Sequence, residues 1–166
     1  PISVNVSRMH LKDAEFIYYI EYLLDKYGIE KDLLELEITE TIENINANMM
    51  VKEAKKHGFT LLMDDFGSGY SSLNTLKSTP FDVLKIDRSF LNSFMESSRG
   101  QKIISHTIAM SHDIGLDLIA EGVETREQAD FLSASGCNAA QGFYFSKPIP
   151  TDEFEMLLKA QIEKNK

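Results

Sequence analysis

Leu61-Leu-Met-Asp-Asp-Phe-Gly-Ser-Gly-Tyr-Ser-Ser72 is a short apolar run that ends on two adjacent carboxylates and a loop with two glycines. Residues 60–63 are typical of a buried strand that stops before the acids. Neighbouring carboxylates repel each other in a partly buried site unless a cation lies between them. Their oxygen atoms suit Mg²⁺, Mn²⁺ or Ca²⁺. The stretch therefore predicts a divalent-metal site at a strand end, although a turn followed by a helix cap explains these residues equally well.

Outward from this stretch, strand-like apolar runs alternate with helical patterns along the whole chain. The strand-like runs cover residues 2–6, 33–40, 60–63, 81–87, 116–120 and 137–141. The helical patterns cover residues 11–27, 46–57 (with Asn46 or Asn48 as its cap), 72–77, 101–114, 126–136 and a last segment from 151. Strict alternation predicts an α/β fold in which six parallel strands form a sheet with helices outside.

Length and charge narrow the class of protein. The chain has 166 residues and 43% hydrophobic content, enough for one domain with a buried core. Its 26 acidic and 17 basic residues give a formal charge of −9, which argues against a nucleic-acid partner. A phosphate substrate is still compatible, because bound metal ions supply positive charge.

Cysteine content and hydropathy indicate the compartment. The lone cysteine, Cys137, excludes an intramolecular disulfide and fits a reducing environment. There is no apolar run of membrane-spanning length and no signal peptide. We expect a cytoplasmic domain without membrane contact of its own, whether or not a longer parent protein is anchored to a membrane.

Polar residues fall at or near the carboxyl ends of the strand-like runs. They are Asn5, Glu37, Asp64, Asp65, Lys85, Asp87, Glu121 and Gln141. These ends share one face of a parallel sheet or barrel, where active sites assemble. A lone ammonium at Lys85 would be costly inside a strand. We expect acids to hold it protonated, where it would orient a water or a phosphate oxygen; a structural salt bridge to Asp87 or a glutamate is the alternative.

Six segments resemble, in order, the signature segments of the EAL family of cyclic-di-GMP phosphodiesterases. They are residues 4–7, 36–40, 64–72, 84–90, 120–125 and 141–143, within a resemblance that runs from residue 2 to residue 154. The resemblance implies a TIM-type (β/α) barrel. It also implies hydrolysis of one phosphodiester of cyclic-di-GMP, which yields linear pGpG.

The same resemblance implies two divalent cations, Mg²⁺ or Mn²⁺, with Ca²⁺ as a substitute or inhibitor. Asn5, Glu37 and Asp64 would hold one cation. Asp64 and Asp65 would hold the other, with Glu121 close by as a ligand or through water. Such paired metals lie roughly 3.5–4 Å apart and activate the attacking water.

Further roles follow from the resemblance. Lys85 would touch the attacking water, with Glu121 and Asp65 as its catalytic neighbours, and Gln141 would support Lys85. Asp87 is a further candidate for substrate binding or support of the site. Independently of the resemblance, Arg88 lies just past a strand end, where it could contact phosphate or guanine; a surface ion pair is the alternative. Loop anchoring, linked in this family to dimer contacts, would involve Glu40, Glu124, Gly67, Ser68 and Gly69.

One signature segment of the family has no counterpart in this chain. The Glu-Ala-Leu segment, whose glutamate completes the first metal site, is absent; Glu21-Tyr-Leu23 matches only its spacing and lies in a helical pattern. A (β/α)₈ barrel also needs about 250 residues. We therefore expect residues 1–166 to form a single partial EAL domain, an incomplete barrel of six strands.

Two expectations follow from an incomplete barrel. The parent protein would be the phosphodiesterase, while this chain would be inactive or impaired; a non-catalytic module that binds cyclic-di-GMP or a protein partner is the alternative. Exposed strand edges invite pairing with a second copy, so we expect a homo-oligomer, most simply a dimer. An open doubly wound sheet fits the strand count but not the six ordered segments.

Overall fold

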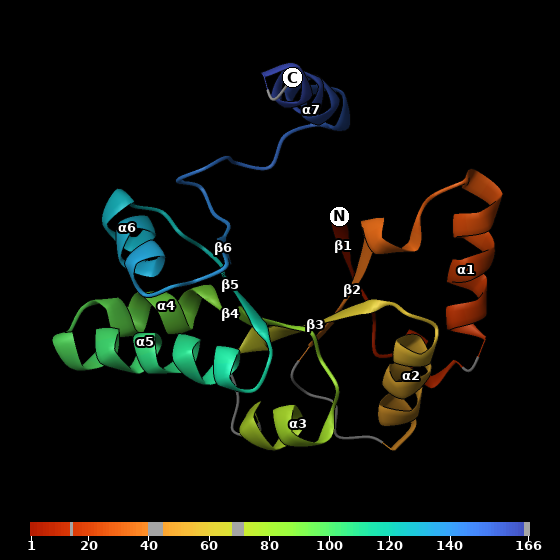
Figure 1. Cartoon of the computed structure of the whole chain (residues 1–166), viewed down its shortest axis with the longest axis horizontal. Helices are drawn as coiled ribbons and strands as arrows, with labels where there is room; N and C mark the ends of the chain where they lie inside the picture. The colour runs from red at the N-terminus through yellow and green to blue at the C-terminus, as the bar shows by residue number, and fades with distance from the viewer. Residues whose placement is uncertain (14, 40–44, 68–71, 165–166) are drawn as a thin grey trace.

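A computed structural model describes residues 1–13, 15–39, 45–67 and 72–164 (Figure 1). In this part of the chain, six parallel strands form one sheet, and their spatial order follows the sequence. The strands are β1 (Ile2–Asn5), β2 (Leu34–Thr39), β3 (Thr60–Phe66), β4 (Val83–Ile86), β5 (Asp117–Ala120) and β6 (Ala139–Ala140). The predicted α/β fold with six parallel strands is confirmed.

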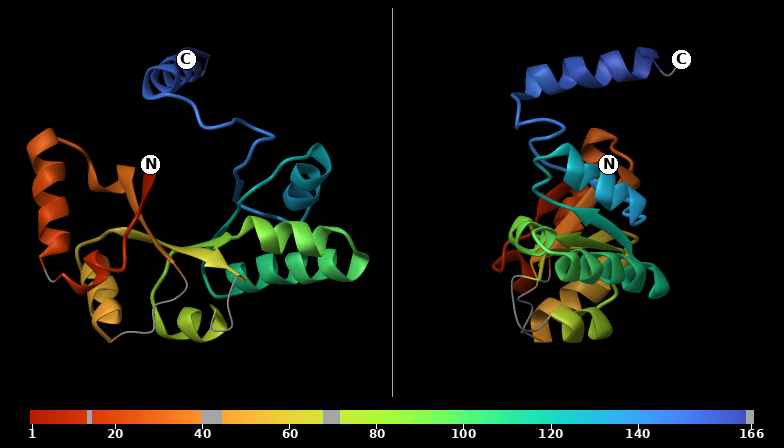
Figure 2. Two further views of the ribbon diagram at one scale, coloured as in Figure 1. Left: turned by 180° about the vertical axis from the view of Figure 1, so that it is seen from behind. Right: turned by 90° about the vertical axis from the view of Figure 1, so that its left-hand side faces the viewer.

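Helices connect successive strands. They are η1 (His10–Lys12), α1 (Phe16–Tyr27), η2 (Lys31–Leu33), α2 (Ile45–Lys56), α3 (Ser72–Ser78), α4 (Arg88–Met95), α5 (Ser98–Asp113), α6 (Arg126–Ala134) and α7 (Thr151–Lys164). Figures 1 and 2 show α1 to α6 along the outer side of the curved sheet, which forms half of a barrel, while α7 stands apart. None of the helices described here is both long and apolar enough to cross a membrane.

The core lies between the sheet and these outer helices. Alternate residues of the four central strands have no exposed surface, namely Leu36, Ile38, Leu61, Met63, Leu84, Ile86, Leu118 and Ala120. They pair with one another across the sheet, as Leu36 does with Leu61. Because side chains alternate along a strand, the residues between them point to the inner side of the half-barrel. Glu37 and Lys85 are among these inner residues.

Several element boundaries differ from the expected ones. The helix expected over residues 11–27 is divided, because η1 ends at Lys12 and α1 begins only at Phe16. Asn46 and Asn48 lie inside α2, which begins at Ile45, so neither caps it. The last strand is two residues long instead of five.

Helix α4 lies between residues 77 and 101, where the apolar pattern predicts no helix. The main-chain N–H of Ser89 donates to Asp87 Oδ1 at 2.8 Å, which caps the helix. Its apolar residues pack on the core, with Leu91 fully buried and Phe90 and Phe94 half-buried. The helix has only eight residues, which is too short for a clear repeat of its apolar face.

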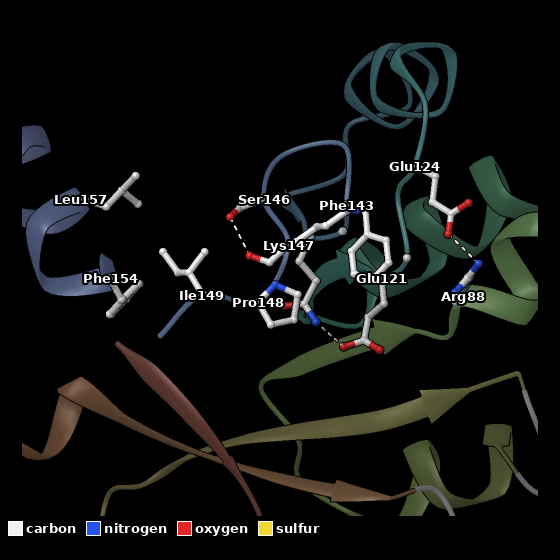
Figure 3. Close-up of a pocket in the computed structure, with 13 residues that line it drawn as sticks. Arg88, Glu121, Glu124, Phe143, Ser146, Lys147, Pro148, Ile149, Phe154 and Leu157 are labelled. Carbon is white, nitrogen blue, oxygen red and sulfur yellow. Dashed lines mark hydrogen bonds and ion pairs between the residues drawn. The ribbon is translucent and has the colours of Figure 1, made fainter. Parts of the chain in front are cut away.

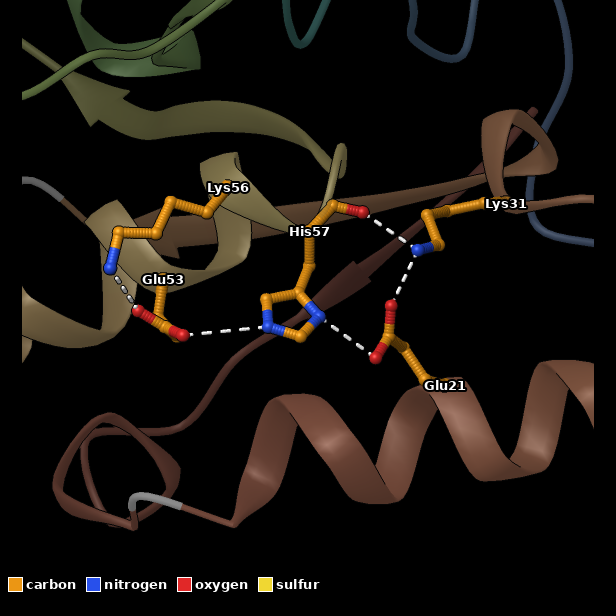
Figure 4. A network of polar contacts seen from close by, with 5 residues as sticks. All are labelled: Glu21, Lys31, Glu53, Lys56 and His57. Atoms are coloured by element: carbon orange, nitrogen blue, oxygen red, sulfur yellow. Dashed lines mark hydrogen bonds and ion pairs between the residues drawn. The ribbon is translucent and has the colours of Figure 1, made fainter.

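A polar network joins α1, η2 and the end of α2 (Figure 4). Lys31 Nζ lies 2.5 Å from Glu21 Oε1 and donates to the main-chain oxygen of His57 at 2.7 Å. The His57 ring lies between two acids, 2.8 Å from Glu21 and 3.4 Å from Glu53. Lys56 pairs with Glu53 at 2.8 Å. The network fixes α1 against α2 on the outside of the half-barrel, away from the carboxyl ends of the strands.

Candidate functional site

Lys85 lies at the centre of the polar residues that end the strands. Its side chain, on β4, is only 4% exposed. Its Nζ atom lies 2.5 Å from Oε1 of Glu121, 2.8 Å from Oε1 of Glu37 and 3.4 Å from Oδ1 of Asp64. One ammonium group therefore contacts acids that β2, β3 and the end of β5 supply.

A β-bulge explains how β3 supplies two acids at one place. The register between β3 and β4 shifts between Met63 and Phe66, so that Asp64 and Asp65 stand opposite Lys85. Asp65 has a φ of 60°, in the left-handed region, where Asp is one of the few tolerated residues other than glycine. The strand therefore continues through both acids to Phe66, and the prediction that it ends before them is wrong.

Burial and hydrogen bonding determine the charge of this cluster. Burial alone would lower the pKa of Lys85, but hydrogen bonds to Glu121 and Glu37 outweigh it and raise that pKa above its usual range. Burial raises the pKa of the Glu121 carboxyl, against the opposite effect of Lys85, and the charges of Asp64 and Glu37 add to the increase. Lys85 is therefore an ammonium ion at neutral pH, and Glu121 is a stronger proton acceptor than an exposed glutamate.

Gln141 and Asn5 lie at the two edges of the site. Nε2 of Gln141, which follows β6, donates to Oε1 of Glu121 at 2.7 Å, the same oxygen that contacts Lys85. Asn5 ends β1 and pairs in register with Glu37. The sheet thus brings Gln141 into the cluster and places Asn5 next to one of its members.

The residues after β4 and β5 form a second, more exposed group. Arg88 pairs with Glu124 at 2.5 Å, and both side chains are partly solvated. Gly122 lies against Arg88, since a Cβ atom there would come 2.3 Å from Cγ of the arginine. Asp87 caps α4 through Ser89 instead of reaching Lys85.

Of the loop-anchoring residues, Glu40, Ser68 and Gly69 lie outside the described part of the chain. Gly67 has a φ of 94°, and a Cβ atom there would come 2.3 Å from the Phe90 ring. This glycine therefore lets the main chain at residue 67 pack against Phe90 of α4. The partner that the structure gives Glu124 is Arg88.

This order of acids, lysine and glutamine at successive strand ends matches a known family over most of the chain. Residues 1–148 match the EAL domain family. The chain belongs to the EAL domain family. The resemblance noted from the signature segments is thereby confirmed.

Relatives of this EAL chain are found among curated proteins and solved structures. It is 37% identical over 163 residues to the signaling protein YkoW of Bacillus subtilis, covering 96% of this chain and 20% of that protein. It is 37% identical over 162 residues to the cyclic di-GMP phosphodiesterase NbdA of Pseudomonas aeruginosa, and this match covers 96% of this chain and 21% of NbdA. The solved structure of the EAL domain of Mycobacterium smegmatis DcpA superposes with a TM-score of 0.89 at 37% identity. The superposition covers 95% of this chain and 72% of the DcpA chain. The chain thus spans about a fifth of the length of these two curated relatives.

The donor set of the EAL site fits the divalent cations that the family implies. Oδ1 of Asp64 is buried without a hydrogen-bond partner among the described residues, and such an oxygen is suited to a cation. Glu37, Asp65 and Glu121 add carboxylates, and Asn5 adds a carboxamide oxygen. Within the described ranges, however, no three His, Cys, Asp or Glu side chains already surround a metal position. The acids converge on the Lys85 ammonium instead.

A cavity of about 570 Å³ opens beside Glu121 (Figure 3). Glu121 and the Arg88–Glu124 pair line one side of it, and Phe154 and Leu157 of α7 line another. Gln141 is also among the lining residues. Lys147 also lines the cavity and lies over the Phe143 ring, with its Nζ atom 5.9 Å from the ring centre. The cavity is therefore bounded by apolar surface, by the positively charged side chains of Arg88 and Lys147, and by Glu121 of the Lys85 cluster.

Lys147 lines this cavity, although no pattern in the sequence points to it. It lies six residues after Gln141, in the loop between β6 and α7, with no strand or helix to set its direction. Its only signal in the sequence is that it shortly follows the Gln141-Gly-Phe143 segment.

Proposed function

We propose that this chain carries residues of a cyclic-di-GMP phosphodiesterase site, within an EAL domain to which all 166 residues belong. The observation that carries the proposal is the contact of Lys85 with acids from three other strands, next to a cavity. The matched phosphodiesterase NbdA supports it. The reaction adds one water molecule across one phosphodiester of the cyclic dinucleotide and yields linear pGpG.

Lys85 and Glu121 act on the attacking water in two different roles, one as a hydrogen-bond donor and the other as a proton acceptor. The Lys85 ammonium is a donor only, so it orients a water molecule or a phosphate oxygen through that atom's lone pairs. Glu121, whose pKa is raised mainly by burial, accepts the proton that the water loses. Gln141 Nε2 holds the Glu121 carboxylate in place at 2.7 Å. These two roles need both side chains in the same small volume, which their 2.5 Å contact provides.

The proposed ligands of the two divalent cations, Mg²⁺ or Mn²⁺, are Asn5, Glu37, Asp64, Asp65 and Glu121. When bound, such cations neutralise charge on the phosphate and lower the pKa of a coordinated water. The buried Oδ1 of Asp64 supports this assignment, because among the described residues it makes no hydrogen bond and has only the longer ion-pair contact with Lys85 at 3.4 Å. Arg88 and Lys147 add positive charge at the cavity, which suits a phosphate group.

Hydrolysis of cyclic-di-GMP by this chain tests the proposal, with Mg²⁺ or Mn²⁺ present and pGpG followed by chromatography. We expect slow turnover, because this chain has no counterpart of the Glu-Ala-Leu glutamate. We expect Asp64→Asn to abolish it, since the variant loses a ligand charge. Asp130→Asn makes the same chemical change on an exposed face of α6 and serves as the control. A wild-type chain that forms no pGpG, or an Asp64→Asn variant of unchanged rate, contradicts the proposal.

A second candidate is a module that binds cyclic-di-GMP without hydrolysing it. One observation favours it: Glu37, Asp64 and Glu121 contact Lys85, and no three acidic, His or Cys side chains of the described residues are arranged around a metal position. Calorimetric titration of cyclic-di-GMP into the metal-free chain separates the two candidates. Tight binding without turnover in Mg²⁺ or Mn²⁺ supports this second function.

We also propose that the chain forms a homo-oligomer, most simply a dimer. All four residues of the edge strand β1 are exposed, and an exposed strand edge pairs readily with another chain. Light scattering over a range of protein concentrations tests this. Monomer at every concentration contradicts it.

A further inference from the structure

One side-chain pair, Asn92 and Gln128, joins α4 to the loop that follows Glu121. Nε2 of Gln128, in the first turn of α6, donates to Oδ1 of Asn92 at 2.9 Å. Oε1 of Gln128 accepts the main-chain N–H groups of Glu124 at 2.8 Å and Thr125 at 3.1 Å. Gln128 therefore uses both ends of its amide, one for the loop and one for α4.

The contact with Asn92 is additional to helix capping. The Thr125 hydroxyl accepts a hydrogen bond from the main-chain N–H of Gln128 at 3.2 Å. Oε1 of Gln128 accepts one in turn from the main-chain N–H of Thr125, which completes a capping box. This box needs only the oxygen of the Gln128 amide. The amide nitrogen of Gln128 donates to Asn92 of α4, and this hydrogen bond is not needed to begin α6.

The loop held in this way is short and tightly packed. It runs from Glu121, whose carboxylate contacts Lys85, to Thr125 at the start of α6. Gly122, with a φ of 66°, lies directly against Arg88 of α4. The buried Val123 donates its main-chain N–H to the Gln141 oxygen at 3.1 Å. With so few residues, a shift of Thr125 relative to α4 is transmitted to Glu121.

Helix α4 is also fixed to the acidic strand β3. Phe90 packs against Gly67, which directly follows β3, and its ring centre lies 6.3 Å from that of Phe66. The same helix thus contacts the segments that follow Asp65 and Glu121. The Asn92–Gln128 pair completes this connection on the Glu121 side.

We propose that Asn92 and Gln128 are positioning residues that hold the Glu121 carboxylate against Lys85 for the hydrolytic reaction. The inference rests on the proposed phosphodiesterase function. Neither residue touches the reacting atoms; they act through the loop that carries Glu121. The pair is therefore needed for the rate of the reaction and not for the start of α6.

Exchange of amides for carboxylates tests the pair without removing the helix cap. Asn92→Asp still accepts a hydrogen bond from Gln128. Gln128→Glu still accepts the two loop N–H groups, and the Asn92 amide can rotate to donate to it. The double variant sets two carboxylates face to face with no donor between them, which is unfavourable.

Two measurements on the full chain compare wild type, both single variants and the double variant. The first is kcat and KM for cyclic-di-GMP. We expect each single variant within roughly twofold of wild type and the double variant reduced roughly tenfold in kcat with little change in KM. The second is the ¹⁵N signal of the Lys85 ammonium group by NMR, which we expect to move only in the double variant.

The outcomes separate the inference from the proposed function. A double variant with the kcat and the Lys85 signal of the single variants overturns the inference. So does a double variant that melts at a lower temperature but keeps its kcat and its Lys85 signal, because the pair is then merely structural. If the wild-type chain hydrolyses nothing, the proposed function fails, and the NMR measurement alone decides whether the pair positions Glu121.

Discussion

The ammonium nitrogen of Lys85 lies 2.5 Å from Oε1 of Glu121, and the same carboxylate oxygen accepts a hydrogen bond from Gln141 at 2.7 Å. Neighbouring parallel strands β4, β5 and β6 supply these three residues. Because each residue lies at the same end of its strand, the sheet alone brings the three together. Glu37 and Asp64 complete the arrangement from the other side of β4.

Lys85 is expected to be essential for stability as well as for the site. Lys85→Met leaves Glu37, Asp64 and Glu121 without their shared cation, and breaking a buried ion pair costs about 3–5 kcal/mol. Urea denaturation at neutral pH measures the change in the free energy of unfolding. Lys102→Met, on an exposed part of α5, is the matched control and should change it by less than about 0.5 kcal/mol. Equal stability of the two variants contradicts the assignment.

The network around His57 is expected to make stability depend on pH in the acid range. A hydrogen bond from Lys31 holds the pKa of Glu21 below its ordinary value of 4.5, with a smaller opposing effect of burial. A carboxyl group whose pKa is lower in the folded than in the unfolded chain stabilises the fold at pH values above the unfolded-state pKa. This contribution is lost as the pH falls through the folded-state pKa.

Glu21→Gln should therefore reduce the free energy of unfolding near neutral pH and make its decrease below about pH 4.5 less steep. Denaturation at a series of pH values measures this. Glu96→Gln, at an exposed position after α4, provides the control. Parallel pH profiles for wild type and Glu21→Gln contradict the prediction.

Cys137 is expected to react slowly with thiol reagents in the folded chain. Burial raises the pKa of its thiol, which outweighs the opposing effect of main-chain hydrogen bonds at Ala139 and Ala120. Because the thiolate is the reactive form, Ellman's reagent should label the folded chain at least roughly tenfold more slowly than the urea-unfolded chain. Ser133→Cys in a Cys137→Ser background places a thiol on the exposed face of α6 and should react quickly. Equal rates at the two positions contradict the prediction.

Gly100 is expected to be required for the packing of α4 on α5. A Cβ atom at this position would come 2.0 Å from the main-chain oxygen of Phe94, which cannot rotate away. Gly100→Ala should lower the free energy of unfolding by about 1–3 kcal/mol, although alanine is the better helix former. His106→Ala, on the exposed side of α5, should have little effect. A stabilised Gly100→Ala chain contradicts the close contact.

Local patterns sufficed for some elements and failed for others. The long apolar runs around Leu36, Leu61 and Leu118 predicted buried strands, because a strand buried against helices needs continuous or alternating apolar residues. The short helix α4 carried too weak a repeat to be seen. The bulge at Asp64 and Asp65 carried no local signal, since it depends on the register of β3 against β4.

The sequence by itself determined the class of fold, the family and which polar residues end the strands. These depend on the order and spacing of residues along one chain. Only the tertiary structure decided which of those residues meet: Lys85 with Glu37, Asp64 and Glu121, and Arg88 with Glu124. Contacts between strands depend on register, on the twist of the sheet and on one extra residue in β3. The Asn92–Gln128 contact joins two helices in the same way, and no spacing within either helix predicts it.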